Sequence, residues 1–321
     1  MYVIIGVIIL CFVGLFILSH AVYGRSIMAT VAELYLRASG TKKTLRKAEA
    51  AAAYARQFRL ANDGALKIPA FVSKKYNVRV SEYHGTQVIE LNGDKDSKYT
   101  VLYLHGGAYV SQMTMNGLTA LGRISKMADI KIVAPLYALA PAHTYEETYE
   151  MLLGYYQDLR DSTAGQIIFL GDSAGGGLAI AFAEYLGQIG MEQPDKIITL
   201  SPWLDTTMRN PKIADYEAVD PMLSVRGLVA AGNAWAGDLD ATDYRISPMF
   251  GDTACLDHIY FFVGTREMLY PDVTEFYEKL VGEGKTTGIY IGHGLNHVYP
   301  FYPIPEAHEA GMQIIDIILN R

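Results

Sequence analysis

The chain has 321 residues, half of them hydrophobic, and a formal net charge of −7 at pH 7. This length is enough for one large domain with a full core, and the apolar fraction excludes a disordered or fibrous protein. The negative charge argues against nucleic acid as the main partner. The two cysteines, Cys11 and Cys255, lie far apart, so the sequence predicts neither a disulfide framework nor a cysteine-based metal site.

The N-terminus is the first distinctive segment. Residues 2–18 carry no charged or strongly polar side chain. That is long enough to cross a hydrocarbon core of about 30 Å at about 1.5 Å per residue. A cleaved signal peptide is the alternative, because residues 19–21 (SHA) loosely fit a small-x-small cleavage site, but the basic segment that should precede it is missing. We therefore predict an uncleaved transmembrane anchor over residues 1–24.

The charges after this segment predict its orientation. Basic residues outnumber acidic ones there: Arg25, Arg37, Lys42, Lys43, Arg46 and Lys47 stand against Glu33 and Glu49. The excess of positive charge places the rest of the chain in the cytoplasm. If the segment is cleaved instead, the protein is secreted.

The remainder of the chain predicts an α/β fold. Residues 26–68 are expected to be helical, since 48–53 are almost all alanine and Pro69 follows. Strands are expected at 78–81, 87–91, 99–104, 130–134, 167–170, 196–200, 258–263 and 286–291, and helices at 145–159, 174–186 and 305–319. This alternation predicts a mostly parallel sheet covered by helices on both faces, with functional residues at the carboxyl ends of the strands. Residues 205–245 interrupt it, contain a helical stretch near 223–236, and are predicted to cover the site.

Two glycine-rich motifs each follow a predicted strand. Residues 171–176 (GDSAGG) contain G-x-S-x-G, a strand-to-helix turn that exposes a serine hydroxyl, so Ser173 is the predicted nucleophile. Residues 103–109 (YLHGGAY) form a loop whose glycines let backbone N–H groups approach a substrate oxygen. We expect an oxyanion hole formed by Gly106, Gly107 and Ala174, the residue after the serine. Ala108 stands where a third glycine is common, and a methyl group fits there if its φ is negative.

A serine nucleophile needs a base that reaches it from a loop. Three histidines fall in the last segment, and His297 lies in a loop after the last predicted strand. His293 is closer to the strand end, and His308 falls in the terminal helix. We predict that His297 is the base, with His293 as the alternative.

The third member of such a site is a buried carboxylate that orients the imidazole. In chain order it should come between the serine and the histidine. Glu267 follows the strand predicted at 258–263, and Asp272 is the competing candidate. Asp272 also suits a helix cap, so we predict Glu267.

Together these motifs resemble the hormone-sensitive-lipase-like esterases, the bacterial family IV of the α/β-hydrolase fold, from residue 78 to the end. Residues 137–143 (YALAPAH) are similar to the family's YRLAPEH segment, with Ala138 and Ala142 as departures. Residues 201–205 (SPWLD) and 220–223 (DPML) also resemble family segments.

The resemblance implies a catalytic domain over 76–321 and a helical cap built from 25–75 and from the insertion at 205–245. It implies hydrolysis of short- to medium-chain acyl esters through an acyl-enzyme on Ser173, without a cofactor or metal, and by analogy a possible homodimer. An acyltransferase that uses the same acyl-enzyme is the alternative. A non-catalytic ligand-binding protein of this fold would lack the histidine.

The anchor also suggests a hypothesis about the substrate. The predicted cap helices carry Arg37, Lys42, Lys43, Arg46, Lys47, Arg56 and Arg59. Such a basic face would lie against anionic lipid headgroups, with a lipophilic ester as substrate. The alternative is that the charges are solvated and the anchor only localises the enzyme.

Overall fold

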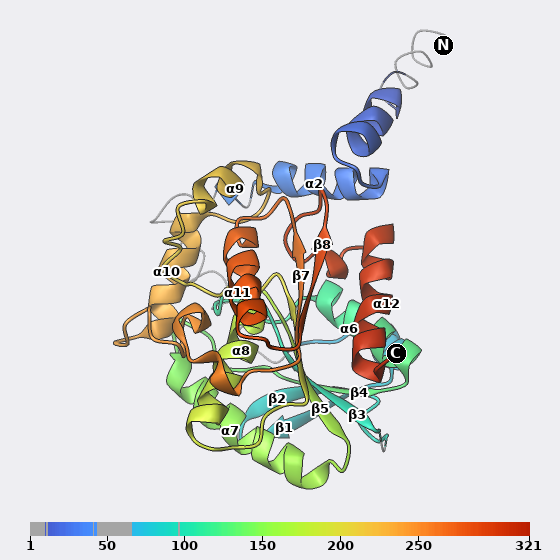
Figure 1. Ribbon diagram of the computed structural model, residues 1–321. Helices are drawn as coiled ribbons and strands as arrows, with labels where there is room; N and C mark the ends of the chain where they lie inside the picture. The colour runs from blue at the N-terminus through green and yellow to red at the C-terminus, as the bar shows by residue number, and fades with distance from the viewer. Residues whose placement is uncertain (1–9, 11, 41, 44–65, 96) are drawn as a thin grey trace.

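The computed structural model describes residues 10, 12–40, 42–43, 66–95 and 97–321. A twisted sheet runs through the body of the molecule with helices packed on both of its faces, and an N-terminal helical segment stands out from this body (Figure 1). The predicted α/β architecture, a mostly parallel sheet with helices on both faces, is confirmed.

The sheet has eight strands in the order β1-β2-β4-β3-β5-β6-β7-β8. The strands are β1 (Val78–Tyr83), β2 (Thr86–Leu91), β3 (Tyr99–Leu104), β4 (Lys131–Pro135), β5 (Gln166–Asp172), β6 (Lys196–Leu200), β7 (Ile259–Gly264) and β8 (Thr287–Gly292). β2 pairs antiparallel with β1 and β4, and every other pair is parallel. The loops that follow β3, β5, β6, β7 and β8 therefore meet at one edge of the sheet.

The two faces of the sheet belong to two cores. Side chains of β3 alternate between them: Leu102 and Leu104 lie in one, Val101 and Tyr103 in the other. The first core is covered by α7 (Tyr145–Ser162), α8 (Ala174–Gln188) and α11 (Tyr270–Gly282), and the second by α5 (Ala70–Tyr76), α6 (Met115–Ala128) and α12 (Pro305–Leu319). Because apolar side chains alternate between the two faces of the strand, each face packs against its own layer of helices.

The N-terminal region differs in part from the expected helices. The helix α2 (Ile27–Ser39) is capped by Ser26, which accepts the N–H of Ala29. Residues 66–69 are not helical, since Leu66 exchanges hydrogen bonds with the Gln87 side chain. The rest of the predicted helix, over 44–65, lies outside the described residues.

α5 lies at the end of the segment predicted to form the N-terminal cap. Its residues 70–75 belong to the range 25–75, which the resemblance assigned to the cap, and Tyr76 is the next residue. The Tyr76 ring lies so close to Gly122 of α6 that a Cβ there would be 2.5 Å from the ring. α5 therefore packs on the body of the domain.

Residues 1–24, predicted to be an anchor, are described only in part. A π-helical turn, η1 (Leu18–Val22), ends the protruding segment, and α2 follows at a sharp angle (Figure 1). Within the described residues, no single helix is long and apolar enough to cross a membrane. The pair Phe12–Val22 and Ile27–Ser39 reaches that length and composition only together, with a bend of 101°.

The insertion between β6 and β7 contains two helices where the sequence suggested one. They are α9 (Ile213–Val219) and α10 (Val225–Ala236). The chain bends between them at Asp220, whose carboxylate accepts the N–H groups of Met222 and Leu223. These helices lie to one side of the sheet, near the edge where the loops after β6 and β7 lie (Figure 1).

β8 is an edge strand, and most of its side chains are half-buried. Such an edge is available to pair with the same strand of a second copy, as the homodimer suggested by analogy would require. The dimer stays a prediction.

Candidate active site

Ser173 lies in a sharp turn between β5 and α8. Its φ is +53° and its ψ is −121°, a conformation that costs a non-glycine residue about 1–3 kcal/mol. The turn is held by close backbone packing: a Cβ on Gly175 would lie 2.1 Å from the Leu104 carbonyl oxygen. The N–H groups of Gly176 and Gly177 bond to the Ser173 carbonyl and begin α8. The glycines of the motif therefore permit the close packing that holds the strained turn and presents the serine.

The structure brings together the three residues predicted to act on the substrate. His297 Nε2 is 2.9 Å from Ser173 Oγ, and His297 Nδ1 is 2.5 Å from Glu267 Oε2. Ser173, Glu267 and His297 follow β5, β7 and β8, and all three are buried. Burial lowers the pKa of His297, but the carboxylates of Glu267, Asp220 and Asp172 outweigh it and raise the pKa above 6.5.

The alternative candidates lie elsewhere. The Asp272 carboxylate, in the first turn of α11, accepts a hydrogen bond from Asn210 Nδ2 at 2.8 Å. Burial raises the pKa of Asp272 to about 7. His293 is exposed in the turn after β8, and His308 is exposed on α12. Neither Asp272 nor these histidines makes a described contact with the serine.

The acid has a partner that the sequence reasoning missed. Glu267 Oε1 accepts hydrogen bonds from Ser201 Oγ and from the Gly264 N–H, both at 2.7 Å. Ser201 Oγ in turn accepts the N–H of Val298, the residue after the histidine. Ser201 opens the SPWLD segment, which was the available signal. One hydroxyl thus joins the loop that carries Glu267 (residues 265–269, the acid loop) to the loop that carries His297 (residues 293–298, the histidine loop).

The predicted oxyanion hole needs one correction. The N–H of Gly106 donates to Asp172 Oδ1 at 2.8 Å, so this donor is occupied. A Cβ at Gly106 would lie 2.4 Å from Asp172 Oδ2, which shows how closely the loop approaches that carboxylate. Asp172, which also accepts from Tyr103 Oη, was missed from the sequence because its role requires the tertiary contact.

Three other N–H groups at this edge are available. Within the described part of the chain, the N–H groups of Gly107, Ala108 and Ala174 have no hydrogen-bond acceptor. Ala174 begins α8, where N–H groups lack helical partners and the helix dipole favours negative charge. Ala108 has φ +53°, not the negative value expected for a methyl group at this position. The next residue, Tyr109, also has positive φ and stacks on Trp235 of α10 at 4.3 Å.

His105, the first residue of the HGG motif, has a structural place. Its ring stacks on Tyr137 with a centroid distance of 4.1 Å, and Tyr137 is the first residue of the YALAPAH segment. Burial lowers the pKa of His105 to about 4. The ring is therefore neutral at pH 7 and supports the loop from inside.

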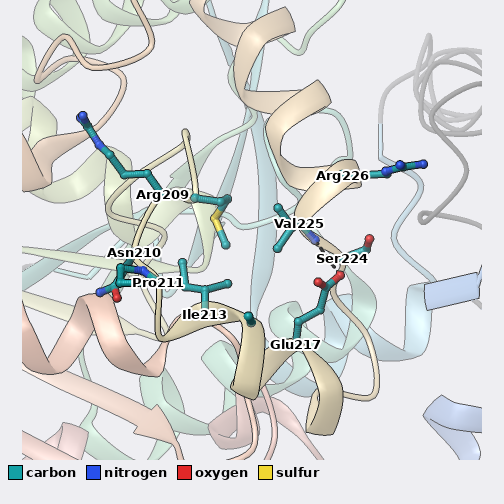
Figure 2. Close-up of a pocket in the computed structure, with 10 residues that line it drawn as sticks. Arg209, Asn210, Pro211, Ile213, Glu217, Ser224, Val225 and Arg226 are labelled. Carbon is teal, nitrogen blue, oxygen red and sulfur yellow. Dashed lines mark hydrogen bonds between the residues drawn. The ribbon is translucent and has the colours of Figure 1, made fainter.

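A cavity of about 670 Å³ lies between α9 and α10 (Figure 2). Its lining is mixed, and includes Met208, Arg209, Asn210, Pro211, Ile213, Ala214, Glu217, Ser224, Val225 and Arg226. None of the three residues at the serine site lines it. Met208 in the cavity wall accepts a hydrogen bond from the Trp203 indole, and the Trp203 backbone N–H donates to the Ser173 carbonyl.

Comparisons with known proteins agree with this geometry. Residues 101–301 match the model of an alpha/beta hydrolase fold family. An esterase of Acinetobacter venetianus is 27% identical over 205 residues, covering 63% of this chain and 68% of that protein. The crystal structure of a candidate esterase from Staphylococcus aureus is 28% identical, has a TM-score of 0.81, and covers 84% of this chain and 92% of that one. A hormone-sensitive-lipase homologue from a metagenome library has the same fold, with a TM-score of 0.71 at 21% identity over 84% of this chain and 98% of that one.

The family match covers more than half of the chain, so the chain belongs to the α/β-hydrolase fold family. Within that family it is a serine hydrolase of carboxylic esters, as the motifs predicted.

Proposed function

We propose that Ser173, His297 and Glu267 are the catalytic triad of this ester hydrolase. The observation that carries the proposal is the hydrogen-bonded chain from Ser173 Oγ through His297 to Glu267, at 2.9 Å and 2.5 Å. His297 Nδ1–H donates to the glutamate, which leaves Nε2 as the acceptor for the serine proton.

The reaction proceeds in two steps. Ser173 Oγ attacks the ester carbonyl carbon while its proton passes to His297 Nε2, and the resulting oxyanion accepts the N–H groups of Gly107, Ala108 and Ala174. The bond to the alcohol oxygen breaks, the alcohol takes the proton from His297, and the acyl group remains on Ser173. Water then gives a proton to His297 and attacks the acyl carbon. The bond between that carbon and Ser173 Oγ breaks, Oγ takes the proton back from His297, and the acid is released. Glu267 stabilises the imidazolium in both steps.

We propose esters with short to medium acyl chains as substrates, and the cap cavity as the place for an apolar chain. Apolar side chains of Met208, Ile213 and Val225 line the cavity, with charged residues at other points of its lining (Figure 2). Burial of apolar surface would favour a longer chain there. The substitution Val225→Trp fills this space, so it should shift the acyl-length optimum towards shorter chains.

The test of this function is hydrolysis of p-nitrophenyl esters from acetate to palmitate. We expect activity on the short and medium esters that is abolished in Ser173→Ala and His297→Ala. Retained activity in either variant would contradict the proposed triad. An alcohol added to the assay measures acyl transfer, with the transferred ester as product.

We further propose that the N-terminal segment attaches the enzyme to a membrane. Large apolar side chains on it are exposed, among them Phe12, Val13, Phe16 and Ile17. After the bend, α2 presents a second exposed apolar row: Met28, Val31, Leu34 and Tyr35 are each about half exposed or more. Exposed apolar surface of this extent is unusual on a protein surrounded by water. The angle of 101° suits a first segment that enters the bilayer and an α2 that lies along its surface.

The basic residues support this arrangement less directly than the sequence suggested. Arg37 donates to the Val219 carbonyl, and Lys42 to the Asp220 carbonyl, so both contact the cap insertion. Lys43 is exposed, and Arg46, Lys47, Arg56 and Arg59 lie outside the described residues. The apolar rows, more than the charges, therefore support contact with lipid.

Membrane attachment is tested by alkaline carbonate extraction of membranes that contain the full chain. We expect the wild type to stay with the membrane and the double variant Val13→Lys/Ile17→Lys to be released. Release of the wild type would contradict the anchor. Protease treatment of sealed vesicles of known orientation tests the proposed cytoplasmic side, and a mature chain without its first residues would favour secretion after cleavage.

A further inference from the structure

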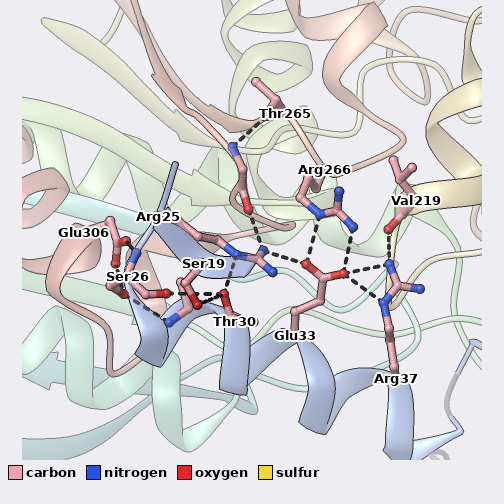
Figure 3. A network of polar contacts seen from close by, with 12 residues as sticks. Ser19, Arg25, Ser26, Thr30, Glu33, Arg37, Val219, Thr265, Arg266 and Glu306 are labelled. Carbon is pink, nitrogen blue, oxygen red and sulfur yellow. Dashed lines mark hydrogen bonds and ion pairs between the residues drawn. The ribbon is translucent and has the colours of Figure 1, made fainter. Parts of the chain in front are cut away.

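Glu33 is a buried carboxylate on α2, far in the sequence from the triad but next to its loops. Its exposed fraction is 3%, and it faces three arginines (Figure 3). Arg266 makes a two-pronged contact, with Nε and Nη2 each 2.9 Å from a Glu33 oxygen. Arg25 Nη1 lies 2.5 Å from Oε2, and Arg37 Nε lies 2.8 Å from Oε1. Both oxygens of Glu33 are therefore engaged from several directions.

The charge of Glu33 is stable over the range in which an esterase works. Burial alone would raise the pKa of Glu33, but the hydrogen bonds from Arg266, Arg25 and Arg37 outweigh it and lower the pKa to about 2. A two-pronged arginine–carboxylate contact also fixes direction, since both groups are planar. The carboxylate is a fixed charged link between α2 and the arginines.

Arg266 connects this link to the acid loop. It directly precedes Glu267, and its own N–H donates to the Leu295 carbonyl in the histidine loop at 2.9 Å. Arg266 is thus fixed at two points, its guanidinium to Glu33 and its backbone to the histidine loop. The next residue, Glu267, contacts His297.

Arg25 connects it to the histidine loop. Its Nη1 donates to the Gly294 carbonyl at 2.6 Å, three residues before His297. Gly294 has φ +70°, and a Cβ there would lie 2.2 Å from the Tyr23 carbonyl oxygen. The segment just before α2 (residues 23–26, the N-terminal arm) therefore packs directly on the histidine loop. The guanidiniums of Arg25 and Arg266 each lie 4.4 Å from the centre of the Tyr23 ring.

We propose that Glu33 is a positioning residue for catalysis: through Arg266 and Arg25 it sets the register of the acid loop against the histidine loop. The two loops also meet directly, where His297 contacts Glu267 and where the Gly294 N–H donates to Thr265 Oγ1 at 2.9 Å. The inference rests on the proposed triad, and it does not depend on membrane attachment.

The experiment compares full-length Glu33→Gln and Glu33→Asp with Glu306→Gln. Glu306 is the matched control, because it accepts hydrogen bonds from the N–H and hydroxyl of Ser26, just before α2, and in the described part of the chain it bonds to neither catalytic loop. Kinetics with p-nitrophenyl butyrate are measured well below each variant's Tm, with active sites counted by an organophosphate titrant.

For Glu33→Gln we expect kcat per active site to fall by about tenfold with KM changed by less than about twofold, because loop register acts on the transition state. The acid limb of the kcat profile should shift to lower pH, since a displaced Glu267 stabilises the His297 cation less. Glu33→Asp keeps the charge but shortens the reach, so it should lower kcat less than Glu33→Gln and shift the acid limb by a correspondingly smaller amount. Glu306→Gln should leave both unchanged.

Wild-type kcat in Glu33→Gln, or an equal loss of kcat in Glu306→Gln, would overturn the proposal, because the arm would then act only through folding. If Glu33→Gln does not fold, Glu33→Asp decides, and a wild-type kcat in that variant overturns it. Failure of the triad itself is distinguished by activity that survives in Ser173→Ala.

Discussion

The Ser201 hydroxyl donates a hydrogen bond to Glu267 Oε1 at 2.7 Å and accepts the N–H of Val298 at 2.9 Å. Ser201 follows β6, has φ +51°, and is fully buried. One side chain in the loop after β6 therefore supports both Glu267 and the backbone next to His297, the two residues that activate Ser173.

Ser201→Ala tests this relationship. The change removes one hydrogen bond to the acid and leaves the buried Val298 N–H without an acceptor, at a cost of about 1–3 kcal/mol in the free energy of unfolding. We expect kcat to fall by about tenfold with KM nearly unchanged. Kinetics and chemical denaturation measure the two effects, and a variant with wild-type kcat would show that Glu267 is held without Ser201.

The identity of the acid is tested by Glu267→Gln, with Asp272→Asn as the matched control. Glutamine keeps the shape of the side chain but cannot stabilise an imidazolium, and such a change costs on the order of 10⁴ in kcat in comparable triads. Asp272 bonds to Asn210, away from His297, so its amide variant should retain activity. The reverse pattern in steady-state assays would transfer the role of the acid to Asp272.

The pH dependence of kcat/KM follows from His297. Its pKa in the folded protein is raised above 6.5 by the neighbouring carboxylates, and the base must be neutral to accept the serine proton. Activity should therefore fall as the pH drops through that raised value, with the midpoint of the acid limb above 6.5. In Glu267→Gln the midpoint of the residual activity should move to lower pH. A wild-type midpoint below 6.5 would mean that burial dominates over the carboxylates.

Ala108→Gly tests the unexpected backbone of the HGG loop. Alanine at φ +53° is strained, whereas glycine adopts this conformation freely but loses more entropy on folding. We expect a net gain of about 1 kcal/mol in the free energy of unfolding with kcat retained, because the N–H at this position is unchanged. A large loss of kcat would show that the methyl group itself places the loop.

Much of the site could be predicted from the sequence because its motifs are local. G-x-S-x-G determines its own turn, and the order of Ser173, Glu267 and His297 along the chain follows the order of β5, β7 and β8. Parallel strands then bring these loops to one edge. The fold was predictable for the same reason, since strands and helices with strong apolar patterns specify their own positions.

The features that could not be predicted depend on contacts between distant residues. The N–H of Gly106 is taken by Asp172, 66 residues further along the chain, and Glu33 meets Arg266 across 233 residues. α9 was missed, and the turn that separates it from α10 depends on Asp220 accepting the N–H groups that follow it. α6 was also missed, although Thr114 caps its first turn.

The central claim, that Ser173 forms the covalent intermediate, is tested most directly with diethyl p-nitrophenyl phosphate. Attack by the serine would release p-nitrophenolate and leave a diethylphosphoryl group that water removes only slowly. Peptide mass spectrometry of the full chain should find one such group, on Ser173, and none on the Ser173→Ala variant. An adduct on a different residue, or ester hydrolysis that continues after Ser173 is fully modified, would contradict the account.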